Sequence, residues 1–267
     1  MNNTIFNCKS LIIGHRGAKG NIMENTIESI LYAIRAGVDG IEFDIQRCLT
    51  GELVLFHDET LDRLSFKDQF YFGRTRNKLI HKLQWYDLYN TELIDSLGRK
   101  YKIPKLIDVL RHLEVYNSDV LINIEIKDNT SHESLCNLLM DLIDEGLYEP
   151  ERFMVSSVFL DPLLYVHEFK EESEIKDSNY QKMKIGWIFS EENIPAAGLL
   201  NSINFNSKVL THIVIDKDIL DQGIITYIKR LGLSVFVYTI NQVSEYPIKN
   251  LDTIVEGIIT DKPKIFK

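Results

Sequence analysis

Residues 40–57 read GIEFDIQRCLTGELVLFH, and this stretch predicts two strands of different kinds. Residues two apart on a strand share a face, so Glu42 and Asp44 point one way in the first strand while the apolar residues around them point the other. An apolar outer face is typical of a barrel strand that helices cover. The two acids are therefore expected to point into a barrel.

The second strand, residues 53–57, begins too soon after the first for a parallel crossover, which needs about a dozen residues or more. The two strands are therefore predicted to form an antiparallel hairpin. With Thr50 and Gly51 as the turn, counting back along both strands places His57 opposite Asp44. This register predicts that His57 lies beside the inward-pointing acids.

The rest of the chain alternates short apolar runs with longer segments of helical period, which is the pattern of βα units around a parallel sheet. The predicted strands are residues 11–14, 40–46, 120–126, 153–156, 184–189, 212–215, 233–238 and 257–260. The predicted helices are residues 25–36, 107–113, 133–145, 162–169 and 218–231, with weaker crossovers around 194–205 and 243–251. This α/β pattern closes most naturally into a TIM-type (β/α)8 barrel, although a doubly wound open sheet gives a similar one.

The length of 267 residues fits one such barrel or two average domains. The pattern favours a single domain over residues 1–267, in which the polar and aromatic segment 58–104 is an insertion. A loop of that length is usually functional, a small subdomain or partly disordered. The hydrophobic share of 45% and the charged share of 26% are ordinary for a globular protein that buries a full core.

The net charge of -9 argues against nonspecific binding of nucleic acid, because phosphate backbones attract clustered Lys and Arg. A phosphate ester could still bind at a site that carries its own cation. Three cysteines without close spacing, Cys8, Cys48 and Cys136, fit a reducing compartment. Neither a signal peptide nor a transmembrane segment is recognisable, so the chain is expected in the cytoplasm. The oligomeric state stays open.

His15 and Arg16 directly follow the first predicted strand and precede Gly17. Loops after barrel strands form the active-site face, so this pair suits proton transfer and phosphate binding. The structural alternative is a plain turn, with Gly17 at the bend and Asn25 capping the following helix. So short a motif does not decide between the two.

The strand at residues 120–126 repeats the arrangement of the acids, with Glu125 and then Lys127 on its inner face. Buried carboxylates repel one another unless a cation compensates. Three oxygen ligands with Glu42 and Asp44 suit Mg²⁺ or Ca²⁺, whereas ion pairs such as Lys127 with Glu125 are the structural alternative. Two histidines beside a metal-bound phosphate would supply the base and the acid of a phosphodiester cleavage.

Together these residues resemble the glycerophosphodiester phosphodiesterase family. The matching pieces run in the family's order from residue 12 to residue 263: IIGHRG, MENTIESI, AGVDGIEFDIQ, LVLFHDETLDR, IPKLIDVL, LINIEIK, FMVSS and GIITDKP. The resemblance implies a TIM-type barrel, one divalent cation, Mg²⁺ or Ca²⁺, and hydrolysis of small-molecule glycerophosphodiesters to glycerol 3-phosphate and an alcohol. It implies that His15 and His57 are the acid/base pair. It also implies that the metal ligands are Glu42, Asp44 and Glu125, and that the phosphate-binding residues are Arg16 and Lys127.

Two positions depart from the family's pattern. In VFVYTIN, many relatives carry Trp where this chain has Ile240, which puts stacking on the glycerol side in question. In RCLTGEL, Thr50 replaces the usual Asp of the hairpin tip. The family also carries an insertion after its second histidine, where 58–104 lies and would shape the leaving-group side.

Two other functions remain open at this point. One is a phospholipase D type cleavage of lysophospholipids, similar to the sphingomyelinase D branch of the same barrel. Aromatic residues of the insertion would then accept an acyl chain or, alternatively, form a small core: Phe66, Phe70, Tyr71, Phe72, Trp85 and Tyr86. The other is a noncatalytic barrel that binds a phosphate ester, which would not need two histidines.

Overall fold

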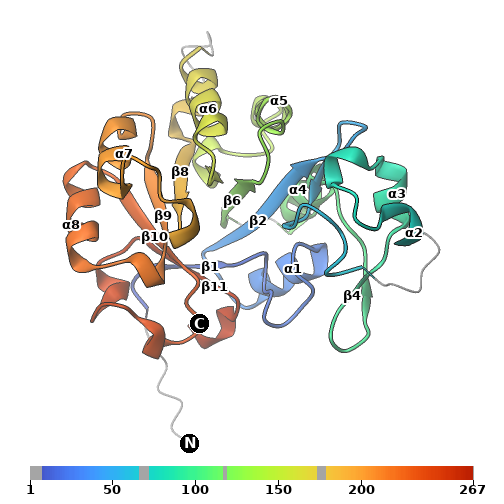
Figure 1. The fold of residues 1–267 in the computed structure, drawn as a ribbon, viewed down its shortest axis with the longest axis horizontal. Coiled ribbons are helices and arrows are strands. Elements are labelled where there is room, and N and C mark those ends of the chain that lie inside the picture. Colours follow the sequence, from blue (N-terminus) through green and yellow to red (C-terminus); the bar gives the residue numbers. More distant parts are fainter. Residues whose placement is uncertain (1–7, 66–71, 117–118, 173–178, 267) are drawn as a thin grey trace, which may run out of the picture.

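The computed structural model describes residues 8–65, 72–116, 119–172 and 179–266, and its centre is a closed barrel of eight parallel strands (Figure 1). The barrel strands are β1 (Leu11–Gly14), β2 (Gly40–Arg47), β6 (Leu121–Ile126), β7 (Phe153–Ser157), β8 (Lys184–Phe189), β9 (His212–Asp216), β10 (Ser234–Tyr238) and β11 (Gly257–Thr260). The strand β1 pairs with both β2 and β11. This closure confirms the predicted barrel and excludes the open sheet.

Helices surround the barrel (Figure 1), and they are α1 (Ile27–Arg35), α4 (Leu106–Val115), α5 (His132–Asp144), α6 (Leu160–Glu172), α7 (Leu199–Asn206) and α8 (Gln222–Arg230). The crossover around 243–251 differs from the prediction, because it contains two 3₁₀ turns, Val243–Glu245 and Leu251–Thr253. The N-cap of α1 is Thr26, whose side chain accepts from the Ser29 N–H. The interpretation of Asn25 as the cap is therefore wrong.

The apolar outer face of β2 is fully buried, with Ile41, Phe43 and Ile45 in the main core between the strands and the helices. A second apolar layer fills the barrel interior and includes Met154 and Phe236. Two interior glycines make room for these large side chains. A Cβ atom at Gly186 would lie 2.2 Å from Met154 Cε, and one at Gly257 would lie 2.9 Å from the Phe236 ring.

The strand β3 (Leu53–Leu55) pairs with β2 in the predicted antiparallel hairpin, but in a different register. Leu55 lies opposite Ile45, and the Phe56 N–H donates to the Asp44 carbonyl at 3.2 Å. The predicted pairing of His57 with Asp44 is therefore wrong by one residue. The hairpin loop has three residues instead of two, since the Cys48 N–H donates to the Glu52 carbonyl at 3.0 Å.

Residues 58–104 include α2 (Phe72–Thr75), a 3₁₀ turn (Ile80–Lys82), α3 (Trp85–Asn90), β4 (Leu93–Ile94) and β5 (Lys100–Tyr101). These elements lie together beside β2 and α1 (Figure 1). Their buried residues, such as Leu61, Ile80 and Leu88, form a small core that the insertion shares with Val54 and Phe56 of the hairpin. Trp85 packs against this core, whereas the side chain of Tyr86 is exposed. Phe66, Phe70 and Tyr71 lie outside the described residues. None of the helices described has the length and apolar character that a membrane span requires.

Candidate active site

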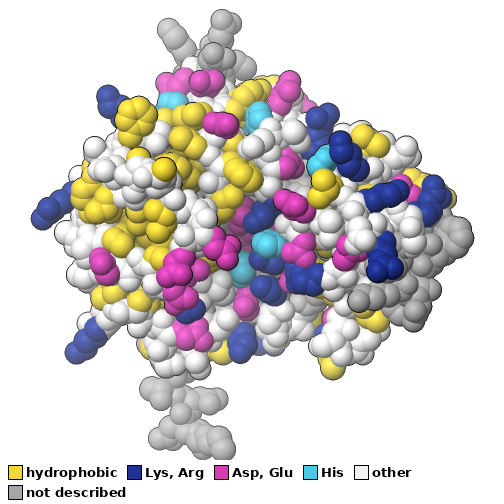
Figure 2. Space-filling model, viewed as in Figure 1, with side chains coloured by type: hydrophobic (Ala, Val, Ile, Leu, Met, Phe, Trp, Pro, Cys, Tyr) yellow, Lys and Arg dark blue, Asp and Glu magenta, His cyan; other side chains and the backbone are white. Residues whose placement is uncertain are grey.

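A pocket of about 670 Å³ opens at the carboxyl ends of the barrel strands. Histidines and charged side chains gather around its mouth, and an apolar surface lies to their left (Figure 2). Six of the seven sequence candidates line it, namely His15, Arg16, Glu42, His57, Glu125 and Lys127. The seventh, Asp44, is only 1% exposed and lies against this group. The structure thus brings all seven candidates together.

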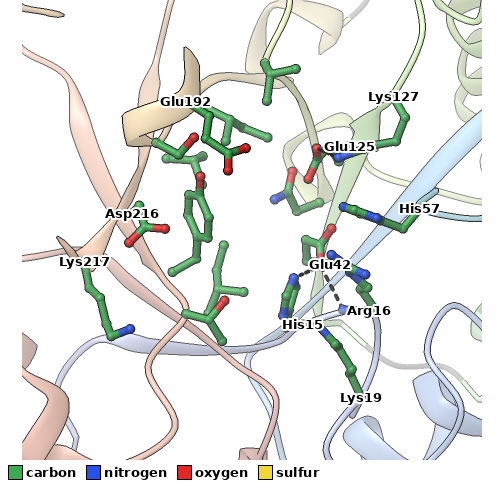
Figure 3. A pocket seen from close by; sticks show the side chains of 18 of the residues that line it. His15, Arg16, Lys19, Glu42, His57, Glu125, Lys127, Glu192, Asp216 and Lys217 are labelled. Carbon is green, nitrogen blue, oxygen red and sulfur yellow. Dashed lines mark hydrogen bonds and ion pairs between the residues drawn. The ribbon is translucent and has the colours of Figure 1, made fainter. Parts of the chain in front are cut away.

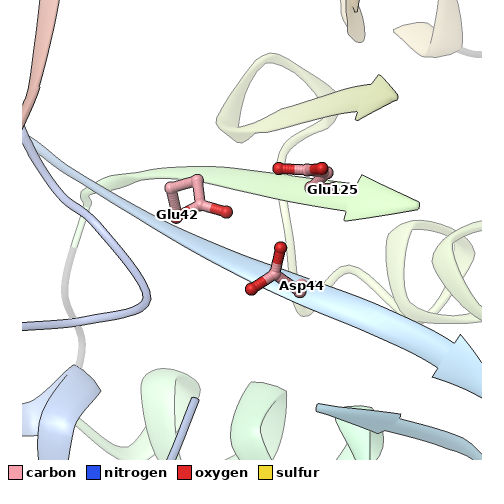
Figure 4. Close-up of side chains that lie close together, drawn as sticks. All are labelled: Glu42, Asp44 and Glu125. Atoms are coloured by element: carbon pink, nitrogen blue, oxygen red, sulfur yellow. The ribbon is translucent and has the colours of Figure 1, made fainter. Parts of the chain in front are cut away.

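Three of these candidates form an acidic cluster across two neighbouring strands. Asp44 on β2 lies opposite Glu125 on β6, and Glu42 is two residues before Asp44 on the same face (Figure 4). One carboxylate oxygen from each residue lies within 4.8 Å of the others. The period of two along β2 and the parallel register with β6 therefore create the cluster.

The acidic cluster is incompletely compensated by the protein. The Oε1 atom of Glu42 and the Oδ1 atom of Asp44 are buried and have no hydrogen-bond partner among the described residues. Burial and the charges of Asp44 and Glu125 raise the pKa of Glu42 well above its usual value. Burial opposes ionisation of Asp44 too, but the charges of Arg16 and Lys127 outweigh it and lower the pKa of that carboxyl. Converging, unpartnered carboxylate oxygens fit a hard divalent cation.

Arg16 lies at the floor of the pocket in a left-handed backbone conformation, with φ 48°. Its N–H donates to Glu42 Oε2 at 2.8 Å, its Nε lies 3.3 Å from Asp44 Oδ2, and its Nη1 donates to Glu24 Oε1 at 2.7 Å. The next residue, Gly17, is required by the same turn, because a Cβ atom there would lie 2.6 Å from Ser29. The tight turn after β1 thus places the positively charged guanidinium of Arg16 directly against the acidic cluster.

Lys127 is the second positively charged side chain beside the acidic cluster. Its Nζ lies 2.7 Å from Glu125 Oε1 and 3.8 Å from Asp44 Oδ1. Burial would lower the pKa of Lys127, but the charges of Glu125 and Asp44 raise it overall, so the side chain is an ammonium. The ion pair expected as the structural alternative is therefore present, and the lysine lines the pocket at the same time.

Both histidines are held through Nδ1 by an aspartate. His15 Nδ1 lies 2.6 Å from Asp261 Oδ1, and His57 Nδ1 lies 2.7 Å from Asp58 Oδ1. A hydrogen bond at Nδ1 selects the tautomer and leaves Nε2 for chemistry. His57 reaches the pocket although its register differs from the prediction, because it lies two residues beyond the end of β3 (Figure 3).

The sequence model of the glycerophosphoryl diester phosphodiesterase family matches residues 15–265. The chain belongs to this family. The glycerophosphodiester phosphodiesterase of Bacillus altitudinis is 30% identical over 259 residues, which cover 94% of each chain. That of Caldanaerobacter subterraneus subsp. tengcongensis is 33% identical over 156 residues, and this match spans only 58% of its length.

Solved structures of similar fold include other phosphodiesterases. A putative glycerophosphoryl diester phosphodiesterase from Silicibacter pomeroyi has a TM-score of 0.75 at 17% identity, and the match covers 98% of this chain and 94% of that one. An Oleispira antarctica phosphodiesterase, solved in complex with the product sn-glycerol-3-phosphate, has a TM-score of 0.74 at 20% identity, with 96% and 94% covered. At these identities the structures support the barrel fold of the family.

The two departures from the family pattern have clear structural positions. Ile240 is fully buried in the main core and does not line the pocket, so no ring occupies that position. Two residues before Ile240, Tyr238 does line the pocket, and its hydroxyl donates to the Phe189 carbonyl at 3.1 Å. Thr50 lies at the exposed hairpin tip, where its Oγ1 accepts from the Trp85 N–H at 3.0 Å. Thr50 therefore joins the hairpin to the insertion.

The wall of the pocket opposite the acidic cluster comes from β8, β9 and β10 and the loops that follow them (Figure 3). It combines apolar residues with charged ones, namely Ile188, Val214, Tyr238, Glu191, Glu192, Asp216, Lys217 and Asp218. Sequence reasoning selected none of these residues. Their signal is positional only, since each lies at or just after the end of a predicted barrel strand.

Sequence reasoning assigned no role at the site to five residues that hold the candidates in place: Glu24, Asn25, Asp58, Arg63 and Asp261. Asn25 donates to Asp44 Oδ2 at 2.7 Å and accepts from the Asp44 N–H at 3.1 Å. Asp261 directly follows β11, and that position could have indicated a side chain at the same rim as His15. Burial opposes ionisation of Asp261, but its hydrogen bonds with His15 and Asn241 and the charges of His15 and Lys19 together lower its pKa to about 2.

Proposed function

We propose that this chain hydrolyses glycerophosphodiesters to glycerol 3-phosphate and an alcohol, with Mg²⁺ or Ca²⁺ held by Glu42, Asp44 and Glu125. The observation that carries this proposal is the acidic cluster with two buried, unpartnered oxygens in a pocket that two histidines enter. The family membership supports the same reaction. We further propose that residues 1–267 act as one domain, into which 58–104 is inserted.

The cation would neutralise charge on the nonbridging phosphate oxygens. Arg16 and Lys127, at the edge of the cluster, orient the phosphate and add positive charge where negative charge develops. Both are ion-paired with carboxylates in the pocket, so they remain charged when the substrate enters.

The histidines would move the two protons of the reaction. The oxygen of the attacking water forms a bond to phosphorus, and His15 Nε2 accepts the proton that the water loses. The bond from phosphorus to the alcohol oxygen breaks, and His57 Nε2–H donates its proton to that oxygen. Asp261 and Asp58 stabilise the imidazolium of each ring through Nδ1.

The test is release of glycerol 3-phosphate from glycerophosphocholine and glycerophosphoethanolamine. It is measured with purified protein, with protein treated with EDTA, and after Mg²⁺ or Ca²⁺ is restored. We expect release that EDTA abolishes, that a cation restores and that His15→Ala prevents while the circular dichroism spectrum stays unchanged. A folded, cation-loaded protein that releases nothing from either substrate, or that cleaves only micellar lysophospholipids, would contradict the proposal.

A further inference from the structure

Arg63 lies in the insertion, and its guanidinium joins two carboxylates that each hold a residue of the pocket. Its Nε and Nη2 donate to the two oxygens of Asp58, at 2.5 and 3.0 Å. Its Nη2 and Nη1 donate to the two oxygens of Glu24, at 2.7 and 3.2 Å. A fork of donors bound to both oxygens of each acid fixes the direction as well as the distance of both carboxylates.

Each of these carboxylates also hydrogen-bonds to a residue that lines the pocket. Asp58 Oδ1, which accepts from Arg63, also holds His57 Nδ1 at 2.7 Å. Glu24 Oε1, which accepts from the same Nη2, also accepts from Arg16 Nη1 at 2.7 Å. A continuous chain of contacts therefore runs from the His57 ring, through Asp58, Arg63 and Glu24, to the guanidinium of Arg16 beside the acidic cluster.

The position of Arg63 argues for an indirect action. Its Nε, Nη1 and Nη2 all donate to Asp58 or Glu24, and the side chain is not among the residues that line the pocket. Without it, Asp58 and Glu24 would lose the group that holds them together, and two like charges would repel each other. The hydrogen bonds of Arg63 also lower the pKa of both acids against the effect of burial.

We propose that Arg63 is a positioning residue, which fixes His57 and Arg16 relative to each other and so makes turnover depend on the insertion. This inference rests on the proposed function. The Arg63 side chain is 45% exposed, and the buried Glu24 keeps its ion pair with Arg16 when Arg63 is removed, so the loss of Arg63 should cost little stability. A displacement of about 1 Å in a reacting group, in contrast, can lower a rate by about 10²-fold. Arg63 should therefore affect rate and leave stability nearly unchanged.

The experiment compares Arg63→Ala with Arg99→Ala, since Arg99 is a matched control in the same insertion. Its side chain is 47% exposed and its Nε lies 2.7 Å from Asp95 Oδ2, but in the described part of the chain the Asp95 side chain hydrogen-bonds only to Leu97, Arg99 and Tyr101, none of which lines the pocket. We expect Arg63→Ala to lower kcat by about 10²-fold, with KM and the melting temperature close to those of the wild type. Arg99→Ala should leave kcat unchanged.

Two rescue measurements distinguish positioning from a general structural role. Arg63→Lys should recover only part of kcat, because one ammonium cannot bind both oxygens of two acids. Guanidinium chloride, far below denaturing concentrations, should raise kcat of Arg63→Ala more than equal sodium chloride does. In a double-mutant cycle, Asp58→Asn with Arg63→Ala should cost less than the sum of the single changes, because both act on His57.

The outcomes separate this inference from the function on which it rests. No turnover by the cation-loaded wild type contradicts the proposed function itself. An active wild type with unchanged kcat in Arg63→Ala contradicts the positioning role. A rise in KM alone identifies Arg63 as a substrate-binding residue instead, and a lower melting temperature that matches the loss of activity identifies a structural one.

Discussion

The barrel carries a histidine paired with a carboxylate at each of its ends, and the two pairs differ in what surrounds them. At the carboxyl end, His15 Nε2 makes no hydrogen bond in the described part of the chain; it lies 4.0 Å from Glu42 Oε2 and faces the pocket. At the amino end, His212 Nε2 lies 3.3 Å from Glu256 Oε1 and its Nδ1 lies 2.7 Å from Thr211 Oγ1. The ring of His212 also packs edge-on against Phe236.

An ion pair alone therefore does not identify a histidine that can exchange protons with a ligand. A ring with one nitrogen bound and the other facing a pocket can exchange protons with a ligand, whereas a buried ring with both nitrogens bound stabilises the fold. The same rule extends to His57, whose Nδ1 is held by Asp58 at the edge of the pocket. Four predictions test this difference between the two ends.

The largest expected effect separates His15→Gln from His212→Gln. The first should lower kcat by about 10²- to 10⁴-fold, because a proton-transfer group is lost, with little change in stability. The second should leave kcat within about twofold and lower the free energy of unfolding by about 1–2 kcal/mol, because the buried His212 ring loses its hydrogen bonds. Glycerol 3-phosphate release and urea unfolding measure the two quantities. An equal loss of kcat in both variants would break the comparison.

Binding of Mg²⁺ or Ca²⁺ should stabilise the protein through the acidic cluster at the carboxyl end of the barrel, and not through Glu256 at the amino end. At a free Mg²⁺ or Ca²⁺ concentration about 100 times the dissociation constant, linkage predicts about 2.7 kcal/mol of added stability. Glu42→Gln should abolish this gain, whereas Glu256→Gln should retain it. Thermal unfolding with and without the cation provides the measurement. A gain of the same size in Glu42→Gln would show that the ion binds elsewhere.

A smaller effect on kcat is expected when the carboxylates that hold the His15 and His212 rings are replaced. Asp261→Asn should lower kcat by about tenfold, because a hydrogen bond to a charged partner contributes about 1.5 kcal/mol or more. Glu256→Gln should not change kcat, since neither His212 nor Glu256 lines the active-site pocket. Steady-state kinetics at neutral pH measure both. If the two substitutions lower kcat alike, the His15 pair has no special role in turnover.

The smallest effect concerns acid stability at the amino end. The hydrogen bond from His212 lowers the pKa of Glu256 to about 2, whereas an unfolded glutamate titrates near about 4.3. A depressed folded-state pKa contributes stability above the unfolded value, and this contribution is lost as the pH falls from about 4.3 towards 2. The urea midpoint should therefore fall less in Glu256→Gln than in the wild type between about pH 5 and about pH 3. A parallel fall in both proteins would contradict the assignment.

The positions of the barrel strands and the direction of their acids could be predicted from the sequence. Period-two alternation is a local property, so the inward orientation of Glu42, Asp44 and Glu125 could be predicted without any knowledge of distant contacts. The carboxyl ends of parallel barrel strands all lie on one face, so residues after different strands could be assigned to one pocket. The family resemblance rested on the same local motifs.

The hairpin register, the cap of α1 and the groups that hold the histidines depend on contacts between segments that are far apart in the sequence. The three-residue loop depends on Gly51 at φ 99° and on the Leu49 N–H, which donates to the Leu83 carbonyl in the insertion. Asn25 does not cap its helix because its side chain binds Asp44. Asp261 meets His15 across 246 positions of sequence, after the last strand has closed the barrel. Such partners follow from packing between distant segments, which no local period encodes.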